Sequence, residues 1–287
     1  MAPPDRARDD LLGSDVSALA RPLSFVACGW RHRRLIGQLT RGRIEGRYRG
    51  SLLGGLWVAA LPLLMLGVYT FVFSAVFRAR WGAAGTGGNA DFALILFSGM
   101  ILLGVFTECV NEAPSLMQAH QTYIKQVMFP SEVLAWVVLL ASLWRFGVSL
   151  LILLAGYGFA FGWPPIASLC LPLALLPVVL LTLGAVWLVS SLGVFVRDLA
   201  QFISVFTAAL LFLSPVFYPA SRVPEALQPY LRLNPFSTIL ESSRQSLFEG
   251  HAPDWGALAT VTAVAWLVAW GGYAWFMRTK GSFADVL

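Results

Sequence analysis

Long apolar blocks alternate with short polar stretches along this chain. Each block is close to twenty residues long and nearly free of charge, which is the length a helix needs to cross a hydrocarbon core about 30 Å thick. Six spans are predicted, at about 52–77, 92–111, 133–160, 169–195, 200–218 and 256–276. The blocks are too long and too uniformly apolar for the alternating strands of an outer-membrane barrel. We therefore expect an all-α polytopic membrane protein, since a helix satisfies its own backbone hydrogen bonds within lipid.

Composition excludes a soluble protein and indicates no catalytic site. The chain has 287 residues, of which 57% are hydrophobic and 12% charged, and its mean hydropathy is +0.71. Cys28, Cys109 and Cys170 are too widely spaced for a disulfide framework or a zinc pattern. The three histidines are far apart, the spans hold no paired carboxylates, and no phosphate-binding loop occurs. We expect no metal or cofactor in this chain. If the protein performs active transport, ATP must be hydrolysed by another chain, because this sequence has no phosphate-binding loop.

Half of the basic residues precede the first span: ten of the twenty Lys and Arg lie before residue 50. Residues 1–29 are expected to form a flexible tail, and residues 30–50 an amphipathic helix in the membrane interface, the alternative being a solvated basic arm. With both termini cytosolic, fourteen basic residues lie inside and five outside, as the positive-inside rule favours. Nucleic-acid binding is not expected, because no soluble domain remains to carry it.

Two segments between the spans are longer than a connection requires. Residues 112–131 suit an amphipathic insertion that docks a partner or rests on lipid. Residues 219–254 are broken by prolines, with Asn234 placed to cap a helix that begins at Pro235. This second segment is interpreted either as re-entrant gate helices over the outer mouth of a path or as an external amphipathic cap.

Arg145 is the basic residue predicted inside a span. A charge in hydrocarbon is costly unless it faces water, a partner or a polar substrate, so Arg145 is either a conduit residue or an ion-paired structural one. Counting residues along the spans places Glu108, Arg145 and Asp198 at different depths, which argues against a membrane-embedded enzyme. Four glycines spaced four apart allow close helix packing or are a coincidence: Gly42, Gly46, Gly50 and Gly54.

Five short motifs occur in a recognisable order. They are RYRGSLLGGLW, YIKQVMFPSEVL, FVRDLAQF, LSPVFYP and LNPFSTILESSRQSLFEG. Each is weak alone, but their order and spacing over about residues 30–280 resemble the membrane subunit of ABC-2 type exporters of polysaccharides. The nearest alternative is an ABC-2 permease for drugs or lipids; a passive channel would leave the 112–131 segment unexplained.

The resemblance implies a six-span permease domain over residues 51–280 and a cytosolic tail at 281–287. It implies a homodimer in the bacterial cytoplasmic membrane, with two copies of a separate ABC ATPase that binds ATP and Mg, and a glycan built on polyprenyl diphosphate as substrate. The implied coupling residues are Gln121, Thr122, Tyr123, Ile124, Lys125, Gln126, Val127, Met128 and Phe129. The outer gate candidates are Tyr218, Asn234, Pro235, Glu241 and Arg244.

Two arginines at the start of the first span are candidates for the substrate entrance. Arg47 and Arg49 are hypothesised to attract the diphosphate of the lipid carrier through charge-assisted hydrogen bonds. Their alternative role is to anchor the arm to bulk anionic lipid.

Overall fold

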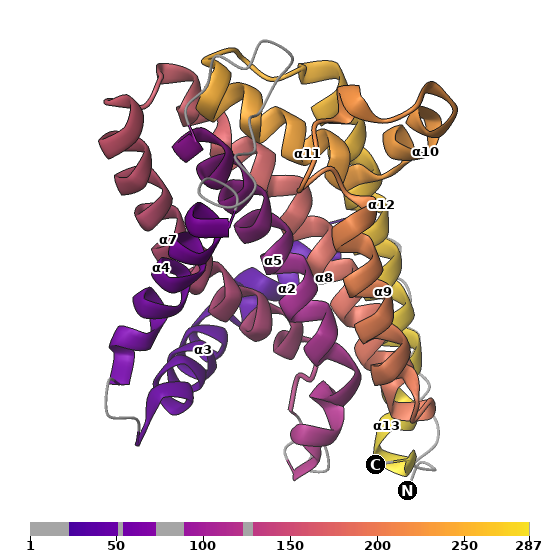
Figure 1. Ribbon diagram of the computed structural model, residues 1–287. Coiled ribbons are helices and arrows are strands. Elements are labelled where there is room, and N and C mark those ends of the chain that lie inside the picture. The colour runs from indigo at the N-terminus through magenta and orange to yellow at the C-terminus, as the bar shows by residue number, and fades with distance from the viewer. Residues whose placement is uncertain (1–22, 51–53, 73–88, 123–128, 287) are drawn as a thin grey trace, which may run out of the picture.

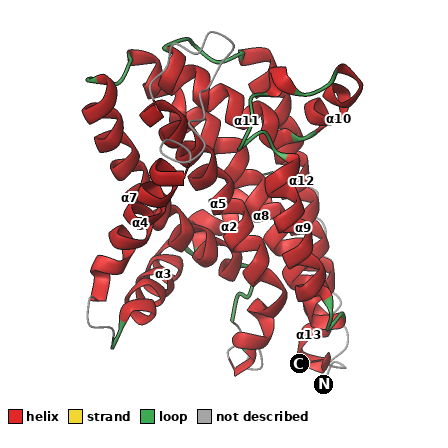
Figure 2. Cartoon of the chain, viewed as in Figure 1, coloured by secondary structure: helices red, strands yellow, loops and turns green. Residues whose placement is uncertain are grey.

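The structure, a computed structural model, describes residues 23–50, 54–72, 89–122 and 129–286. Every regular element within these ranges is helical (Figure 2). Long helices run side by side through the molecule, and short ones lie at both of its ends in Figure 1. The expectation of an all-α polytopic membrane protein is confirmed.

Five helices of the described residues are long and apolar enough to cross a membrane: Gly54–Val72, Phe92–Ala119, Val133–Phe161, Ile166–Phe195 and Trp255–Ser282. They correspond to α4 (Trp57–Tyr69), α5 (Asn89–Ala119), α7 (Val133–Phe161), α8 (Leu171–Phe195) and α12 (Trp255–Thr279). The expected fifth span corresponds to α9 (Leu199–Leu213), which has 15 residues. It ends earlier than expected because Ser214 precedes Pro215 and takes an extended conformation.

Short helices complete the two ends of the bundle. Above lie α10 (Gln228–Leu233), α11 (Pro235–Arg244) and a π-helical turn at Gln245–Glu249. Single 3-10 turns occupy Gly54–Leu56, Ile166–Cys170, Ala220–Arg222, Glu225–Leu227 and Lys280–Ser282. The chain closes with α13 (Phe283–Val286) at the opposite end.

The N-terminal arm forms two helices, where one was expected over 30–50. They are α2 (Ser24–Arg31) and α3 (Arg33–Tyr48), separated at His32. Part of the expected tail is therefore ordered, because Phe25 of α2 is fully buried and packs edge-on against Trp187 and Trp266 at ring distances of 6.1 and 4.9 Å. An aromatic anchor holds the arm to the bundle. Residues 1–22 lie outside the described ranges.

Helix α8 lies at the centre of the bundle, packed between α5 and α12. At three glycines the helix backbones touch one another directly. A Cβ added to Gly184 would collide with the backbone of Val268. A Cβ added to Gly272 would collide with Gly184, and one added to Gly193 with Pro114. The four glycines of the predicted series at 42–54 have no such close neighbour. A Cβ added to any of them would have no described atom within 4 Å, apart from the adjoining backbone of the same segment. Within this chain that series does not mediate close packing, since α3 ends before its last two members.

Helix α5 continues eight residues beyond its expected end at 111, so it takes up the first part of the 112–131 segment. Its apolar face explains the extension, because Cys109, Ala113 and Met117 recur every four residues, Leu116 lies beside them, and all four are buried. The interior Pro114 is accommodated against Gly193 of α8.

Candidate functional site

One face of α5 is left open by the rest of the bundle. Residues on this face recur every three or four positions, as a helix of 3.6 residues per turn requires, and all are partly or largely exposed. They are Ile101, Gly104, Thr107, Glu108, Asn111, Glu112, Ser115 and Gln118. From Thr107 onwards the face is entirely polar. Polar and charged residues in an apolar span are costly, so this stripe marks a functional surface.

Two pockets lie on either side of this polar stripe. The first, of about 410 Å³, is enclosed by α3, α4, α5 and α7, and the second, of about 480 Å³, by α5 and α9. Both are lined by Gly104, Thr107 and Asn111. Thr207 of α9 donates a hydrogen bond of 2.9 Å to the side-chain oxygen of Asn111. The stripe and its pockets therefore form one groove whose α5 side is polar, called the polar groove, and α5 stands between α4 and α9 (Figure 1).

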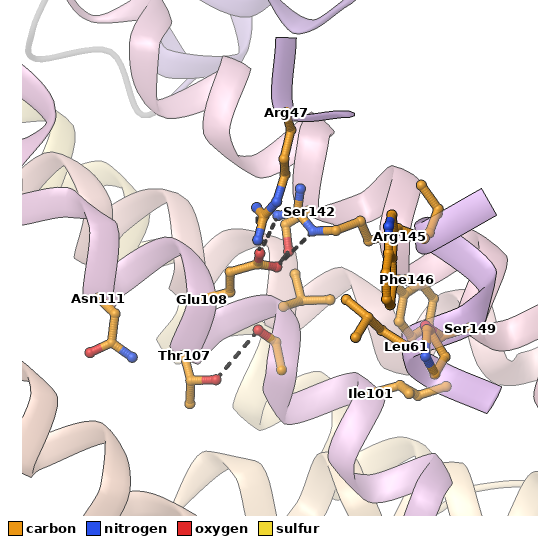
Figure 3. Close-up of a pocket in the computed structure, with 15 residues that line it drawn as sticks. Arg47, Leu61, Ile101, Thr107, Glu108, Asn111, Ser142, Arg145, Phe146 and Ser149 are labelled. Carbon is orange, nitrogen blue, oxygen red and sulfur yellow. Dashed lines mark hydrogen bonds and ion pairs between the residues drawn. The ribbon is translucent and has the colours of Figure 1, made fainter. Parts of the chain in front are cut away.

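The Glu108 carboxylate is the centre of the first pocket, the Glu108 pocket (Figure 3). Arg145 binds both of its oxygens, with Nη2 at 2.6 Å and Nε at 3.0 Å. Arg47 donates from Nη1 at 3.2 Å, and the Ser142 hydroxyl donates at 3.1 Å. Two guanidinium groups thus share one carboxylate, which leaves this cluster with an excess positive charge. Figure 3 shows the two arginines approaching Glu108 from different helices.

A second ion pair lies one helical turn along the same two helices. Arg43 of α3 is bonded to Glu112 of α5, and Arg47 to Glu108. Arg43 and Arg47 are four residues apart on α3, and Glu108 and Glu112 are four residues apart on α5. The two ion pairs therefore lie one helical turn apart, like two rungs of a ladder, and fix α3 against α5. The amphipathic arm is held by the protein itself at this point, in addition to any contact it makes with lipid.

Arg145 lies in the pocket, as its role of conduit candidate requires, and it is also ion-paired. The expectation that Glu108 and Arg145 differ in depth is wrong, because they are in direct contact. Counting failed since α5 extends further than its apolar block. Arg49 is not in the Glu108 pocket: it lines a different, largely apolar pocket with Glu45 and Trp144. The structure therefore separates the two arginines that were predicted to act together.

The predicted cap at Asn234 is confirmed. Its side-chain oxygen accepts a 3.0 Å hydrogen bond from the Phe236 amide, with Pro235 in the first turn of α11. Its amide nitrogen donates to the Leu213 carbonyl at 3.3 Å and to the Ser214 hydroxyl at 3.0 Å. Asn234 thus ties the beginning of α11 to the end of α9.

The remaining outer gate candidates differ in burial. Tyr218 is half-buried and donates to the Phe212 carbonyl at 3.0 Å. Arg244 is only 3% exposed and donates to the Val216 carbonyl at 3.0 Å. Burial lowers the pKa of Arg244 to about 10, while Glu241 acts in the opposite direction. Burial likewise raises the pKa of Glu241, against the opposing effect of Arg244.

The coupling segment is described at its two ends only. Gln121 and Thr122 are helical and exposed directly after α5. Phe129 is half-buried and packs against the cluster of Ile36, Val133 and Val137. Residues 123–128 lie outside the described ranges.

Sequence reasoning missed several groups of the site. Ser142, Thr107 and Thr207 are ordinary residues in apolar blocks, and no local pattern marks them as neighbours of a groove. The ladder did leave a signal: Arg43 and Arg47, like Glu108 and Glu112, are spaced four apart. Complementary spacing of this kind is detectable before a structure is known.

A bundle of apolar helices with a polar groove along one of them is typical of a membrane transport protein. A model of the family described as ABC-2 type transporter matches residues 34–248. The chain is 28% identical over 259 residues to the O-antigen export system permease protein RfbA of Myxococcus xanthus, covering 89% of this chain and 96% of that protein. A protein of the same name from Klebsiella pneumoniae is 24% identical over 255 residues, covering 88% and 95%.

This chain belongs to the ABC-2 type transporter family. It is a multi-pass membrane protein and a transport subunit, not an enzyme. The resemblance inferred from the five motifs is thereby confirmed.

Proposed function

We propose that this chain is the permease subunit of an ATP-driven exporter that moves lipid-linked polysaccharide, such as O-antigen, across the bacterial cytoplasmic membrane. The observation that carries the substrate class is the match to O-antigen export permeases over nearly the whole of both chains. The glycan is carried on a polyprenyl diphosphate, and both termini of the permease lie in the cytosol.

The polar groove on α5 is the path for the glycan. Hydroxyl and amide side chains bind sugars without charge, and Thr107, Asn111 and Ser204 line the groove. A polar groove that faces lipid is costly, so a second copy of the chain covers it in a homodimer. The neighbouring face of α9 supports this arrangement, because it exposes apolar side chains such as Phe206 beside the groove.

Helix α5 transmits the motion of the ATPase. Two copies of a separate ABC ATPase, which bind ATP and Mg, engage the segment from Gln121 to Phe129. This segment follows α5 directly, and a helix of 31 residues passes a displacement at one end to the groove along its side. Residues 219–254 form the outer gate, and the tie from Asn234 to the end of α9 links that gate to a helix of the groove.

Deletion in the native host tests this function. Export by this chain predicts that lipid-linked glycan accumulates on the inner face of the membrane, and that a plasmid copy restores its display. A tagged chain is expected to co-purify with a Walker-motif ATPase. Unchanged glycan display together with new sensitivity to amphipathic drugs would instead establish the alternative, an ABC-2 drug or lipid permease.

A further inference from the structure

The Glu108 carboxylate fills a cradle with the geometry of an oxyanion site. Four hydrogen bonds reach its two oxygens, two from Arg145 and one each from Arg47 and Ser142. A guanidinium fork binds carboxylate and phosphate in the same bidentate manner. The cradle can therefore accept a phosphate group wherever Glu108 withdraws.

Charge in the Glu108 pocket favours an anionic ligand. Two guanidinium groups face one carboxylate, while the neighbouring Arg43 and Glu112 neutralise one another. The remaining polar groups of the lining, among them Asn111 and Ser149, are uncharged. Within the described part of the chain, one positive charge in this partly dehydrated pocket thus exceeds the negative charge that faces it.

The two arginines differ in how many bonds they make to Glu108 and in how exposed they are. Arg145 makes two bonds and its side chain is 19% exposed, whereas Arg47 makes one longer bond and is 53% exposed. An exposed, singly bonded pair contributes little to stability and exchanges readily. Arg47 is therefore the arginine that an incoming anion reaches first, and Arg145 keeps Glu108 from becoming an unpaired charge.

The opposite wall of the pocket is apolar and belongs to α4. Trp57, Val58, Leu61 and Pro62 face the polar side. Leu61 is 50% exposed, so this wall continues onto the outer surface of α4, where a spanning helix meets lipid. A pocket with one charged and one apolar wall suits an amphipathic anion better than a free inorganic one.

We infer that the Glu108 pocket binds the diphosphate group of a prenyl lipid, which displaces Glu108 from Arg47 while the prenyl chain lies along α4. This inference rests on the proposed function and deepens it, because Arg47 stays the headgroup arginine while Arg145, in place of Arg49, is the second arginine of the site and holds the displaced Glu108. Displacement opens one rung of the ladder between α3 and α5. Headgroup arrival is thereby linked to a looser contact between α3 and α5, while α3 stays packed on α7.

Equilibrium binding of radiolabelled geranylgeranyl diphosphate tests the site. The full chain is reconstituted in phosphatidylcholine nanodiscs, and geranylgeraniol, inorganic pyrophosphate and phosphatidylglycerol are added as competitors. The diphosphate lipid is expected to bind saturably, with pyrophosphate a weak competitor and the other two without effect. Competition by phosphatidylglycerol as strong as that by unlabelled ligand would show bulk anionic-lipid binding and overturn the inference, as would stronger competition by pyrophosphate.

Substitutions in the pair Arg47–Glu108 are expected to change the affinity for the lipid in opposite directions, and the same substitutions in the pair Arg43–Glu112 serve as matched controls. Arg47→Gln is expected to weaken binding about tenfold, because one charge-assisted contact is lost. Glu108→Gln is expected to tighten binding about threefold, because the competing carboxylate is gone. Arg43→Gln and Glu112→Gln change the other rung, which does not line the pocket, and are expected to leave affinity within about twofold of the wild type.

A purely structural role for the cluster predicts a different result. In that case Glu108→Gln would weaken or not change binding, and Arg43→Gln would act like Arg47→Gln; either result overturns the site. The melting temperatures of all four variants identify any that misfold. If Glu108→Gln does not fold, Arg47→Gln still tests the site, because Arg47 is half-exposed and its substitution is expected to leave folding intact. Wild-type binding without glycan export would refute the proposed function alone, and export that is unaffected by weakened binding would refute the site alone.

Discussion

Single glycine residues determine how closely the central helices approach one another. Gly184 of α8 and Gly272 of α12 bring the two backbones into contact, and Gly193 does the same for α8 and α5 at Pro114. Lipid provides no hydrophobic driving force between helices, so such close contact is a main source of packing energy in a membrane protein. A methyl group at these positions has no space to occupy.

Replacing Gly272 by Ala is expected to destabilise the chain by about 1–3 kcal/mol, because the new methyl overlaps the Gly184 carbonyl and forces α8 and α12 apart. The neighbouring Gly271 is the matched control, since a side chain there meets no described atom within 4 Å. Both substitutions change helix propensity equally. Thermal unfolding in detergent measures the difference, and equal melting temperatures for the two variants would contradict the packing argument.

At the residue scale, the sequence predicted interactions between residues that are close in the chain, but not contacts between residues on different helices. Asn234 and Pro235 could be identified as a helix start because capping involves residues two or three apart. Contact between Glu108 and Arg145 could not, because it depends on the relative height of two helices. Of 26 glycines in the sequence, no local pattern marks those that touch another backbone.

Helix α3 shows what an element gains from repeated pairing. One exposed ion pair contributes little, but two pairs at matching spacing fix both the position and the direction of one helix on another. Arg43 and Arg47 therefore dock α3 in a single register against Glu112 and Glu108. The sequence predicted the amphipathic helix but not its docking, since its pattern is equally compatible with lipid.

Reversing one rung tests the docking of α3. Arg43→Glu places two carboxylates together and is expected to increase amide hydrogen exchange in α3 about tenfold. Adding Glu112→Arg restores an ion pair and is expected to return exchange to the wild-type rate. Arg41→Glu is the control, because Arg41 pairs with Glu45 on the same helix and its side chain is 83% exposed. Failure of the double variant to recover would contradict a direct pairing.

The whole molecule presents different ends to the two sides of the membrane. Cys170 ends the 3-10 turn Ile166–Cys170 before α8, and this turn contacts the π-helical turn Gln245–Glu249 that follows α11. Cys28 of α2 and Cys109 of α5 are buried. The orientation proposed from the basic arm places Cys170 outside. Orientation and burial together give the three native cysteines distinct reactivities.

A membrane-impermeant maleimide is expected to label Cys170 in right-side-out vesicles at pH 8, and a membrane-permeant maleimide is expected to leave Cys28 unmodified at the same pH. Burial raises the pKa of Cys28 to about 12, so roughly one thiol in ten thousand is ionised at this pH. Raising the pH towards that pKa increases the reactive fraction. Mass spectrometry of the labelled chain provides the measurement, with Cys170→Ser as the blank. Labelling of Cys170 only in inverted vesicles would reverse the orientation.

The bonds to Glu108 also bear on how the chain enters the membrane. Synthesis proceeds from the N-terminus, so Arg47 is made before Glu108, and Arg145 is made 37 residues after it. When α5 is first inserted, Arg47 is the guanidinium of this cluster already available to neutralise the carboxylate. Arg145 takes its place at the same carboxylate once α7 follows. The arm thus supplies a counter-charge for Glu108 from the start of insertion, and Arg47 keeps one bond to that carboxylate in the finished fold.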